Sequence, residues 1–313
     1  MKETEDCFLK IKNPYINFLK EEKIFNKNKV SIKSLKNIYI PLCFWIENQY
    51  LKNRKTLFLG FSGGQGAGKT TISKILKIIL KNYFRRAIQI ISIDDFYKTL
   101  KERKRMSVNI HQMFKTRGVP GTHDINLIKK FFNFIKKKKF KSFKIPKFGK
   151  NIDDRLKKKD WIHVKKRPDI VIFEGWCVGA QHQPQSIIKK PINILEKYQD
   201  KNMIWRQYVN KKLKTEYKNI FEKIDHIIFA KVPDYKMVFK WRLLQEKKLK
   251  KNSNFNKKTM SYKEIKEFIM FYQRITLQMI KDLSKSASVV MLLKKNHEIK
   301  KIIYRKQNDK KNI

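Results

Sequence analysis

The segment from Gly63 to Thr70 reads GGQGAGKT and stands directly between a short apolar run and a run of helical character. Glycines allow successive backbone N–H groups to wrap around a phosphate, and the first turn of a following helix adds positive potential. The pattern G-x-x-x-x-G-K-[ST] in this setting is typical of a nucleotide-binding loop, in which Lys69 reaches the β and γ phosphates and Thr70 holds Mg²⁺. A chance glycine-rich turn is the alternative, and the flanking strand and helix disfavour it. The residues expected at the nucleotide are Gly63, Gly64, Gln65, Gly66, Ala67, Gly68, Lys69, Thr70 and Thr71.

Short apolar runs rich in β-branched residues alternate with helical segments after about residue 55. The expected strands are Thr56–Gly60, Ala87–Ile93, Ile170–Phe173, His226–Ala230 and Ser288–Leu293. The expected helices are Thr70–Tyr83, Ile125–Ile135, Tyr235–Lys250 and Tyr262–Leu283. Strands buried on both faces have this composition, so the pattern predicts an α/β fold with a doubly wound parallel five-stranded sheet. Sites in such sheets form outside the carboxyl ends of the strands.

The chain divides into an N-terminal helical extension, residues 1–54, and a nucleotide-binding domain, residues 55–313. Within the extension, Lys36–Asn53 reads as one amphipathic helix that Pro41 starts or breaks, preceded by a stretch rich in lysine and asparagine. We expect this extension to pack on the domain and to have no separate function. The segment Lys300–Ile313 is expected to be a frayed tail.

The net charge of +48 raises the question of a polyanionic partner. The 75 basic residues comprise 63 Lys and 12 Arg, and the chain is also rich in Asn, Ile, Phe and Tyr. An AT-rich coding sequence produces this set of residues, whereas phosphate and base recognition favours Arg. We therefore expect solvated lysines and no nucleic-acid partner, with a functional polyanion surface as the alternative.

Location and solubility follow from three further features. No apolar run reaches membrane-spanning length, which predicts a protein without a membrane partner. The first residues, Met1 to Asp6, are acidic and lack an apolar core, unlike a signal peptide or a transit peptide. Cys7, Cys43 and Cys177 lack metal-ligand spacing, so we expect reduced thiols in the cytoplasm and no structural zinc.

Two carboxylates follow the second expected strand, in the segment Ser92-Ile-Asp-Asp-Phe-Tyr97. An aspartate beside the phosphate site can accept the proton of an acceptor hydroxyl, which is the role of the base in kinase-type phosphoryl transfer. Helix capping is the alternative, because aspartate is favoured at helix N-termini. The phosphate loop upstream favours catalysis, with Asp94 as the base.

A third carboxylate, Glu174, ends the apolar strand that begins near Ile170. The parallel sheet brings it to the same edge as Lys69 and Asp94. A carboxylate there can hold Mg²⁺ or its waters, whereas a solvated strand end is the alternative.

These motifs together resemble the D-glycerate 3-kinase family of plant, cyanobacterial and fungal type, a group of P-loop kinases related to phosphoribulokinase, uridine kinase and pantothenate kinase. The resemblance extends from about Tyr39 to His297. The segments that carry it are Gly63–Thr71, Ile93–Tyr97, Arg117–Asp124, Pro146–Phe148, Asp154–Arg155, Phe173–Gly179, Trp241–Glu246 and Phe271–Thr276. The resemblance implies a P-loop NTPase fold of the kinase type and phosphorylation of D-glycerate with ATP and Mg²⁺.

The resemblance also implies roles for particular residues. Asp94 corresponds to the catalytic aspartate of these kinases, and Arg242 to a basic residue on the helix that closes over the phosphates. With Lys69 and Glu174 they form the expected catalytic set. The expected acceptor residues are Tyr97, Arg117, His123, Asp124 and Arg155. The chain departs from the family at Gly149, where an aspartate is usual, and this bears on the choice of acceptor.

The residue types agree with a small hydroxy-acid acceptor, which needs cations for its carboxylate and acceptors for its hydroxyl groups. Structural roles are the alternatives: His123 and Asp124 could cap the helix that begins at Ile125, and Arg155 could be a surface charge. Trp176 and Cys177 are expected to pack in the core.

The leading interpretation is an ATP-dependent kinase for D-glycerate. A uridine or pantothenate kinase is the alternative within the same clan, and a nucleic-acid-binding ATPase is a less favoured alternative from another class. A GTPase is disfavoured because no Asn-Lys-x-Asp segment follows a later strand. The sequence leaves the oligomeric state open.

Overall fold

A computed structural model describes residues 2–23, 32–252 and 260–305 of the chain. The lysine- and asparagine-rich stretch before the predicted Lys36–Asn53 helix and the last residues of the predicted tail lie outside the described residues. The strands are β1 (Leu57–Gly63), β2 (Ile88–Ser92), β3 (Phe143–Ile145), β4 (Phe148–Gly149), β5 (Asp154–Arg155), β6 (Ile162–Val164), β7 (Ile170–Gly175), β8 (His226–Lys231), β9 (Val289–Leu293) and β10 (Ile299–Tyr304). The α-helices are α1 (Lys2–Glu21), α3 (Ile40–Asn53), α4 (Lys69–Asn82), α5 (Leu100–Asn109), α6 (Ile125–Lys136), α7 (Gln185–Lys189), α8 (Ile194–Gln199), α9 (Ile204–Lys212), α10 (Lys218–Phe221), α11 (Tyr235–Asn252) and α12 (Tyr262–Ser286).

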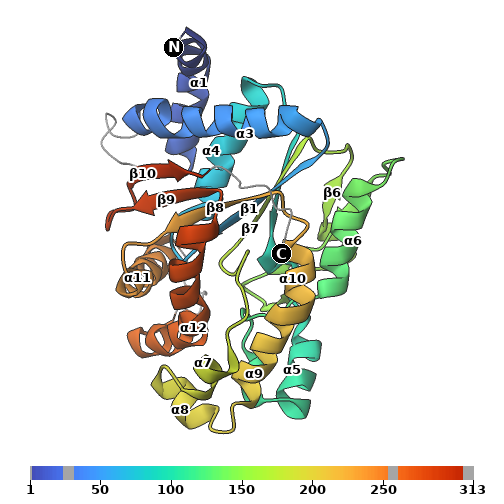
Figure 1. Ribbon diagram of the computed structural model, residues 1–313, viewed down its shortest axis with the longest axis vertical. Coiled ribbons are helices and arrows are strands. Elements are labelled where there is room, and N and C mark those ends of the chain that lie inside the picture. Colours follow the sequence, from blue (N-terminus) through green and yellow to red (C-terminus); the bar gives the residue numbers. More distant parts are fainter. Residues whose placement is uncertain (1, 24–31, 253–259, 306–313) are drawn as a thin grey trace.

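The main sheet has the order β10-β9-β8-β1-β7-β2 (Figure 1). All five predicted strands are present, and they pair in parallel. The prediction of five strands was incomplete, because β10 adds an antiparallel sixth strand at the edge beside β9. The predicted frayed tail was therefore wrong for Lys300 to Tyr304, where exposed Lys300 and Lys301 and half-buried Ile302 and Ile303 belong to an edge strand.

Both faces of the sheet are buried, which explains the continuous apolar runs of its strands. Along β1, Phe58 joins one core, whereas Leu57, Leu59 and Phe61 join the other. Successive side chains of a strand point to opposite faces, so the alternation divides the interior into two hydrophobic cores.

Helices cover each face of the sheet. The core that contains Phe58 is completed by side chains of α6, α9, α10 and α12, and the core that contains Leu59 by side chains of α1, α3, α4 and α11. This three-layer arrangement, visible in Figure 1, is the doubly wound α/β fold predicted from the sequence. It places β1 at the centre, with later strands on both sides.

The first helices pack on the domain. A π-helical turn, Leu35–Tyr39, leads directly into α3, whose first turn contains Pro41. The predicted Lys36–Asn53 helix is thus confirmed, with proline in the first turn, where its missing N–H is tolerated. Buried Cys7 and Ile11 of α1 and Cys43 and Ile46 of α3 contribute to the same core as α4.

A region between Tyr97 and Val164 contains short elements that the sequence pattern did not reveal. The strands β4 and β5 form a small antiparallel pair, and β3 pairs with β6 in another. Two or three residues are too short for a recognisable hydrophobic period, so their pairing depends on tertiary contacts. The loop between β4 and β5 contributes to the site described below.

No helix within the described part of the chain is long and apolar enough to cross a membrane.

Candidate active site

The loop between β1 and α4 has the geometry of a phosphate cradle. Gly66 and Gly68 have φ values of +78° and +79°, in the left-handed region that favours glycine. A Cβ atom on Gly66 would also lie 2.7 Å from Cβ of Trp241 on α11, whereas one on Gly68 would meet no atom within 4 Å. The backbone is therefore constrained on the α11 side and open beside the first turn of α4, where a phosphate would sit.

Side chains of Thr70 and Ser73 on α4 meet Glu174 at the end of β7. Thr70 donates a hydrogen bond of 2.8 Å from Oγ1 to Oε1 of Glu174, and Ser73 donates one of 3.4 Å to Oε2. Glu174 is 6% exposed, so the alternative of a solvated strand end is excluded. Burial raises the pKa of Glu174, against the opposing effects of Lys69 and Thr70.

Lys69 lies folded over its own loop. Its Nζ donates to the carbonyl oxygens of Gly63 and Gly64 at 2.9 and 3.1 Å. Burial lowers the pKa of Lys69, while the charges of Glu174 and Asp94 act in the opposite direction. These two carboxylates therefore offset part of the effect of burial on the Lys69 ammonium, although the net shift of its pKa is downward.

Asp94 and Asp95 follow β2 in a 3₁₀ turn, Ile93–Phe96, capped by Ser92. Asp94 accepts a hydrogen bond of 2.9 Å from the hydroxyl of Tyr97 and lies 3.1 Å from Nζ of Lys150. Burial is the largest single influence and acts to raise the pKa of Asp94, but the Lys150 ammonium, His123 and the Tyr97 hydroxyl together outweigh it, and the net shift is downward. Asp94 is thus ionised at neutral pH, as a general base requires.

Asp95 has a different environment from its neighbour. Its Oδ1 accepts a hydrogen bond from the backbone N–H of Phe148 at 3.3 Å. Burial raises the pKa of Asp95 to about 6. This carboxylate ties β4 to the end of β2, which is a structural role.

Tyr97 and His123 are adjacent on two antiparallel segments. Their rings stack with centroids 4.5 Å apart, and a β-bridge joins the two residues. His123 is fully buried, and its Nδ1 lies 2.6 Å from the hydroxyl oxygen of Tyr217. Burial lowers the pKa of His123 to about 4, so the imidazole is neutral.

Arg117 and Arg155 each hold a carboxylate. Arg117 pairs through Nη1 with Asp153 in the β4–β5 loop, and its guanidinium lies 5.4 Å from the ring centroid of Phe148. Arg155 donates from Nη2 to Asp124 at 3.2 Å and to the carbonyl of Tyr97 at 2.9 Å. Arg155 is mostly buried by these contacts, so it is no free surface charge.

Asp124 also caps α6. Its Oδ1 accepts a hydrogen bond of 3.1 Å from the backbone N–H of Leu127. The alternative reading of Asp124 as a helix cap is therefore correct, and its second oxygen orients Arg155. His123 does not cap the helix, because its imidazole contacts Tyr217 and Tyr97 instead.

Arg242 lies on α11, beside the phosphate loop. Its Nη1 forms an ion pair of 2.7 Å with Glu246, and its guanidinium lies 5.6 Å from the ring centroid of Phe268 on α12. The preceding residue, Trp241, packs against Gly66. The structure thus places Arg242 on the helix that adjoins the phosphate loop, with its charge directed toward α12.

Trp176 and Cys177 pack as expected. Trp176 is 5% exposed and donates from Nε1 to the carbonyl of Gly118 at 3.0 Å. Burial raises the pKa of Cys177 well above its usual value, which makes it an inert thiol. All three cysteines are free and buried, and the described residues contain no cluster of three or more His, Cys, Asp or Glu side chains that could hold a metal ion.

Sequence reasoning missed three residues of this site: Ser73, Lys150 and Tyr217. Ser73 lies one turn after Thr70, so helical spacing could have indicated it. Lys150 is one of many lysines in a basic stretch, and Tyr217 is 94 residues from His123. The sequence contains no signal that distinguishes either of them.

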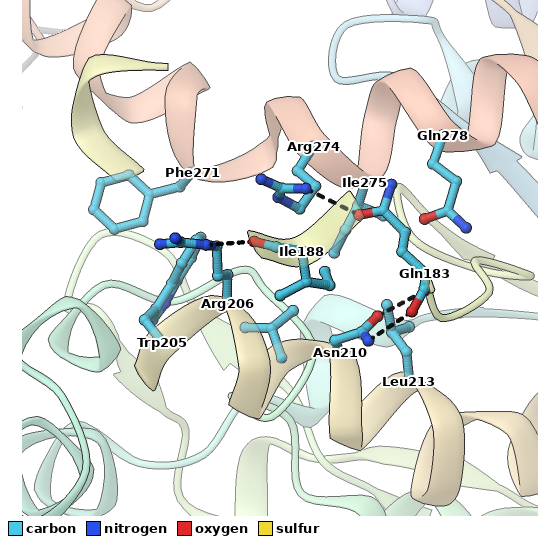
Figure 2. A pocket seen from close by; sticks show the side chains of 11 residues that line it. Gln183, Ile188, Trp205, Arg206, Asn210, Leu213, Phe271, Arg274, Ile275 and Gln278 are labelled. Atoms are coloured by element: carbon cyan, nitrogen blue, oxygen red, sulfur yellow. Dashed lines mark hydrogen bonds between the residues drawn. The ribbon is translucent and has the colours of Figure 1, made fainter. Parts of the chain in front are cut away.

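A small cavity lies between α9 and α12, and Figure 2 shows its lining. Arg206 donates to the carbonyl of Ile188 and Arg274 to the side chain of Gln183 across it. Its volume of about 10 Å³ accommodates no more than one water molecule. None of its lining residues belongs to the phosphate loop or the acceptor segment, so this cavity is not the substrate site.

Comparison with known proteins identifies the proteins to which this chain is similar. No protein-family model matches the chain. A kinase of Schizosaccharomyces pombe described as uncharacterized is 29% identical over 249 residues, which cover 77% of this chain and 87% of that protein. The chloroplastic D-glycerate 3-kinase of Arabidopsis thaliana is 29% identical over 257 residues, which cover 76% of this chain and 53% of the plant protein. The structure of a D-glycerate 3-kinase from Cryptococcus neoformans has a TM-score of 0.72 at 21% identity, covering 86% of this chain and 99% of that one.

The fold is that of the P-loop kinases, as the sequence predicts, and both of the relatives at 29% identity are named as kinases. Within that class the chain is similar to D-glycerate 3-kinases, and the resemblance predicted from its motifs is confirmed by these relatives.

Proposed function

We propose that this protein is an ATP-dependent kinase that phosphorylates D-glycerate at O3 to give 3-phosphoglycerate. The observation that carries the proposal is the convergence of three charged groups at one sheet edge: Lys69 after β1, Asp94 after β2 and Glu174 at the end of β7. The proposed acceptor segment adds two arginines, Arg117 and Arg155, that are each oriented by a carboxylate.

The phosphate loop fits the triphosphate of ATP. The left-handed glycines and the open space beside Gly68 leave room for phosphate oxygens at the start of α4. Lys69 is proposed to leave the carbonyls of Gly63 and Gly64 for the β and γ phosphates when ATP binds. Residues 63–71 together are the proposed nucleotide-binding segment.

The donor set beside the loop fits Mg²⁺, which prefers oxygen ligands and is commonly held by one or two protein groups together with phosphates. Thr70 Oγ1 and Glu174 Oε1 are the proposed holders, and they lie 2.8 Å apart. Bound there, the ion would neutralise charge on the transferring phosphate.

Asp94 is the proposed base. As the O3 oxygen forms its bond to the γ phosphorus and the bond to the β–γ bridging oxygen breaks, the O3 proton passes to the Asp94 carboxylate. The Tyr97 hydroxyl fixes the orientation of that carboxylate. Arg242 is proposed to add positive charge over the phosphates from α11.

The acceptor carboxylate is proposed to bind Arg117 and Arg155. Both guanidinium groups are held in place by carboxylates, Asp153 and Asp124, so little conformational freedom would be lost on binding. Tyr97 and His123 complete the proposed acceptor site.

A side-by-side acceptor assay tests this function. With ATP and Mg²⁺, we expect kcat/KM to be highest for D-glycerate among D-glycerate, pantothenate and uridine. A higher value for pantothenate or uridine would contradict the acceptor assignment and leave the P-loop kinase class unaffected.

The cytoplasmic location and the lack of a nucleic-acid partner stay predictions from the sequence.

A further inference from the structure

His123 has one ring nitrogen that the described protein leaves unused. Its Nε2 is buried and finds no hydrogen-bond partner within residues 2–23, 32–252 and 260–305. A buried polar atom without a partner carries a considerable energetic penalty, so such an atom within a substrate site indicates a group that the substrate completes. His123 belongs to the segment Arg117–Asp124 and stacks on Tyr97, so this atom belongs to the proposed acceptor site.

The partners of the other ring nitrogen decide which nitrogen carries the proton. The hydroxyl oxygen of Tyr217 accepts a hydrogen bond of 2.9 Å from the backbone N–H of Gly121. Among the described residues, Nδ1 of His123 is the acceptor within reach of the Tyr217 hydroxyl hydrogen, at 2.6 Å. Tyr217 therefore donates to Nδ1, and the neutral imidazole carries its proton on Nε2.

The imidazole is also held in a fixed plane. Backbone hydrogen bonds from Lys98 to Thr122 and from Asp124 to Phe96 lock the two segments together on either side of the ring pair. Tyr97, which stacks on the imidazole, in turn donates to Asp94. The Nε2–H donor thus has a set position relative to the proposed base.

We propose that Nε2–H of His123 donates a hydrogen bond to the oxygen on C2 of the acceptor, the hydroxyl that does not react. This inference rests on the proposed function. A permanently neutral donor suits a neutral hydroxyl, whereas the acceptor carboxylate has the charged Arg117 and Arg155 available. The O3 oxygen is a poor partner, because its lone pair must attack phosphorus.

The role makes His123 a specificity residue that selects 2,3-dihydroxy acids over 3-hydroxy acids. An acceptor without a C2 hydroxyl would leave the buried donor unpaired, and sites built around a substrate hydroxyl reject such analogues strongly. Tyr217 is the positioning residue, because it holds the tautomer that carries the proton on Nε2.

The test compares D-glycerate with 3-hydroxypropionate, which lacks the C2 hydroxyl, in the full-length protein. The wild type is expected to favour D-glycerate by about 100-fold or more in kcat/KM. His123→Phe, which keeps the ring stack, is expected to lower kcat/KM for D-glycerate at least about tenfold and to leave 3-hydroxypropionate within about twofold. The exposed His163→Asn variant is the matched control and should change neither value.

A second measurement does not depend on the folding of a core variant. Nitrogen-15 NMR of the wild-type histidines at neutral pH should show one histidine with a protonated Nε2 and an unprotonated Nδ1 whose signals move in Tyr217→Phe. An Nδ1–H tautomer, or an unchanged preference for D-glycerate in His123→Phe, would overturn the inference while the kinase assignment stands. A wild type that fails to phosphorylate D-glycerate would overturn both.

Discussion

Removing the charge of Lys150 should shift the pH dependence of catalysis. Its Nζ lies 3.1 Å from Oδ2 of Asp94, and its ammonium acts to lower the pKa of that carboxylate. Asp94 must be ionised to accept a proton, so activity falls as the pH drops through its pKa. Lys150→Met raises this pKa, and the acidic limb of the profile should therefore move to higher pH.

The exposure of the two side chains sets the size of the shift. Lys150 is 66% exposed and Asp94 is 26% exposed, so solvent screens much of the attraction. An exposed ion pair contributes about 0.2 to 1 kcal/mol. Since 1.36 kcal/mol corresponds to one unit of pKa, the expected shift is about 0.2 to 0.7 of a pH unit. Lys150→Glu should move the limb further in the same direction.

The assay measures kcat/KM for D-glycerate as a function of pH, because this ratio reports ionisations of the free enzyme. Lys147→Met is the matched control, since Lys147 is also exposed, lies three residues away, and is not the partner of Asp94. An acidic limb that stays in place in both Lys150 variants, or that moves to lower pH, would refute Asp94 as the titrating base.

Three other changes have expected outcomes. Lys69→Ala should abolish phosphoryl transfer with little change in Tm, because its ammonium bonds to loop carbonyls and contributes nothing to the core; near wild-type turnover would argue against the phosphate loop. Asp94→Asn should lower kcat, measured by steady-state kinetics, about 100-fold or more, while the affinity for ATP, measured by calorimetry, is retained. A larger loss of kcat in Asp95→Asn would mean that the neighbouring carboxylate is the base. Glu196→Gln should lower the unfolding free energy by about 3 to 5 kcal/mol in denaturant titrations, because it breaks the buried ion pair with Arg274. Glu222→Gln, in the exposed ion pair with Lys218, should lower it by less than about 1 kcal/mol.

The sequence predicted the central fold well because parallel strands buried on both faces leave an unmistakable pattern. β1, β7 and β8 lie within a few residues of their predicted ranges. The edge strand β10 was missed because its exposed lysines and half-buried isoleucines resemble a polar tail. The β4–β5 pair was missed because two-residue strands have no period and form through contacts with distant segments.

The candidate site was predictable where chemistry follows a local motif. Glu174 lies at the end of β7, Asp94 follows β2, and Lys69 follows β1 through the phosphate loop. Parallel topology brings such strand ends together. The double role of Asp124, as a helix cap and a partner of Arg155, required the structure, since Arg155 is 31 residues away. The contact of Tyr217 with His123 has the same origin, because it joins segments that only the fold brings together.

Phosphorus-31 NMR of the reaction product tests the central claim most directly. The purified protein, incubated with ATP, Mg²⁺ and D-glycerate, should convert ATP to ADP with formation of 3-phosphoglycerate. Under the same conditions the Asp94→Asn variant should form 3-phosphoglycerate at least about 100-fold more slowly. A product phosphorylated at O2, or ADP released with inorganic phosphate alone, would contradict a site in which Asp94 takes the proton from O3 while the γ phosphate is transferred.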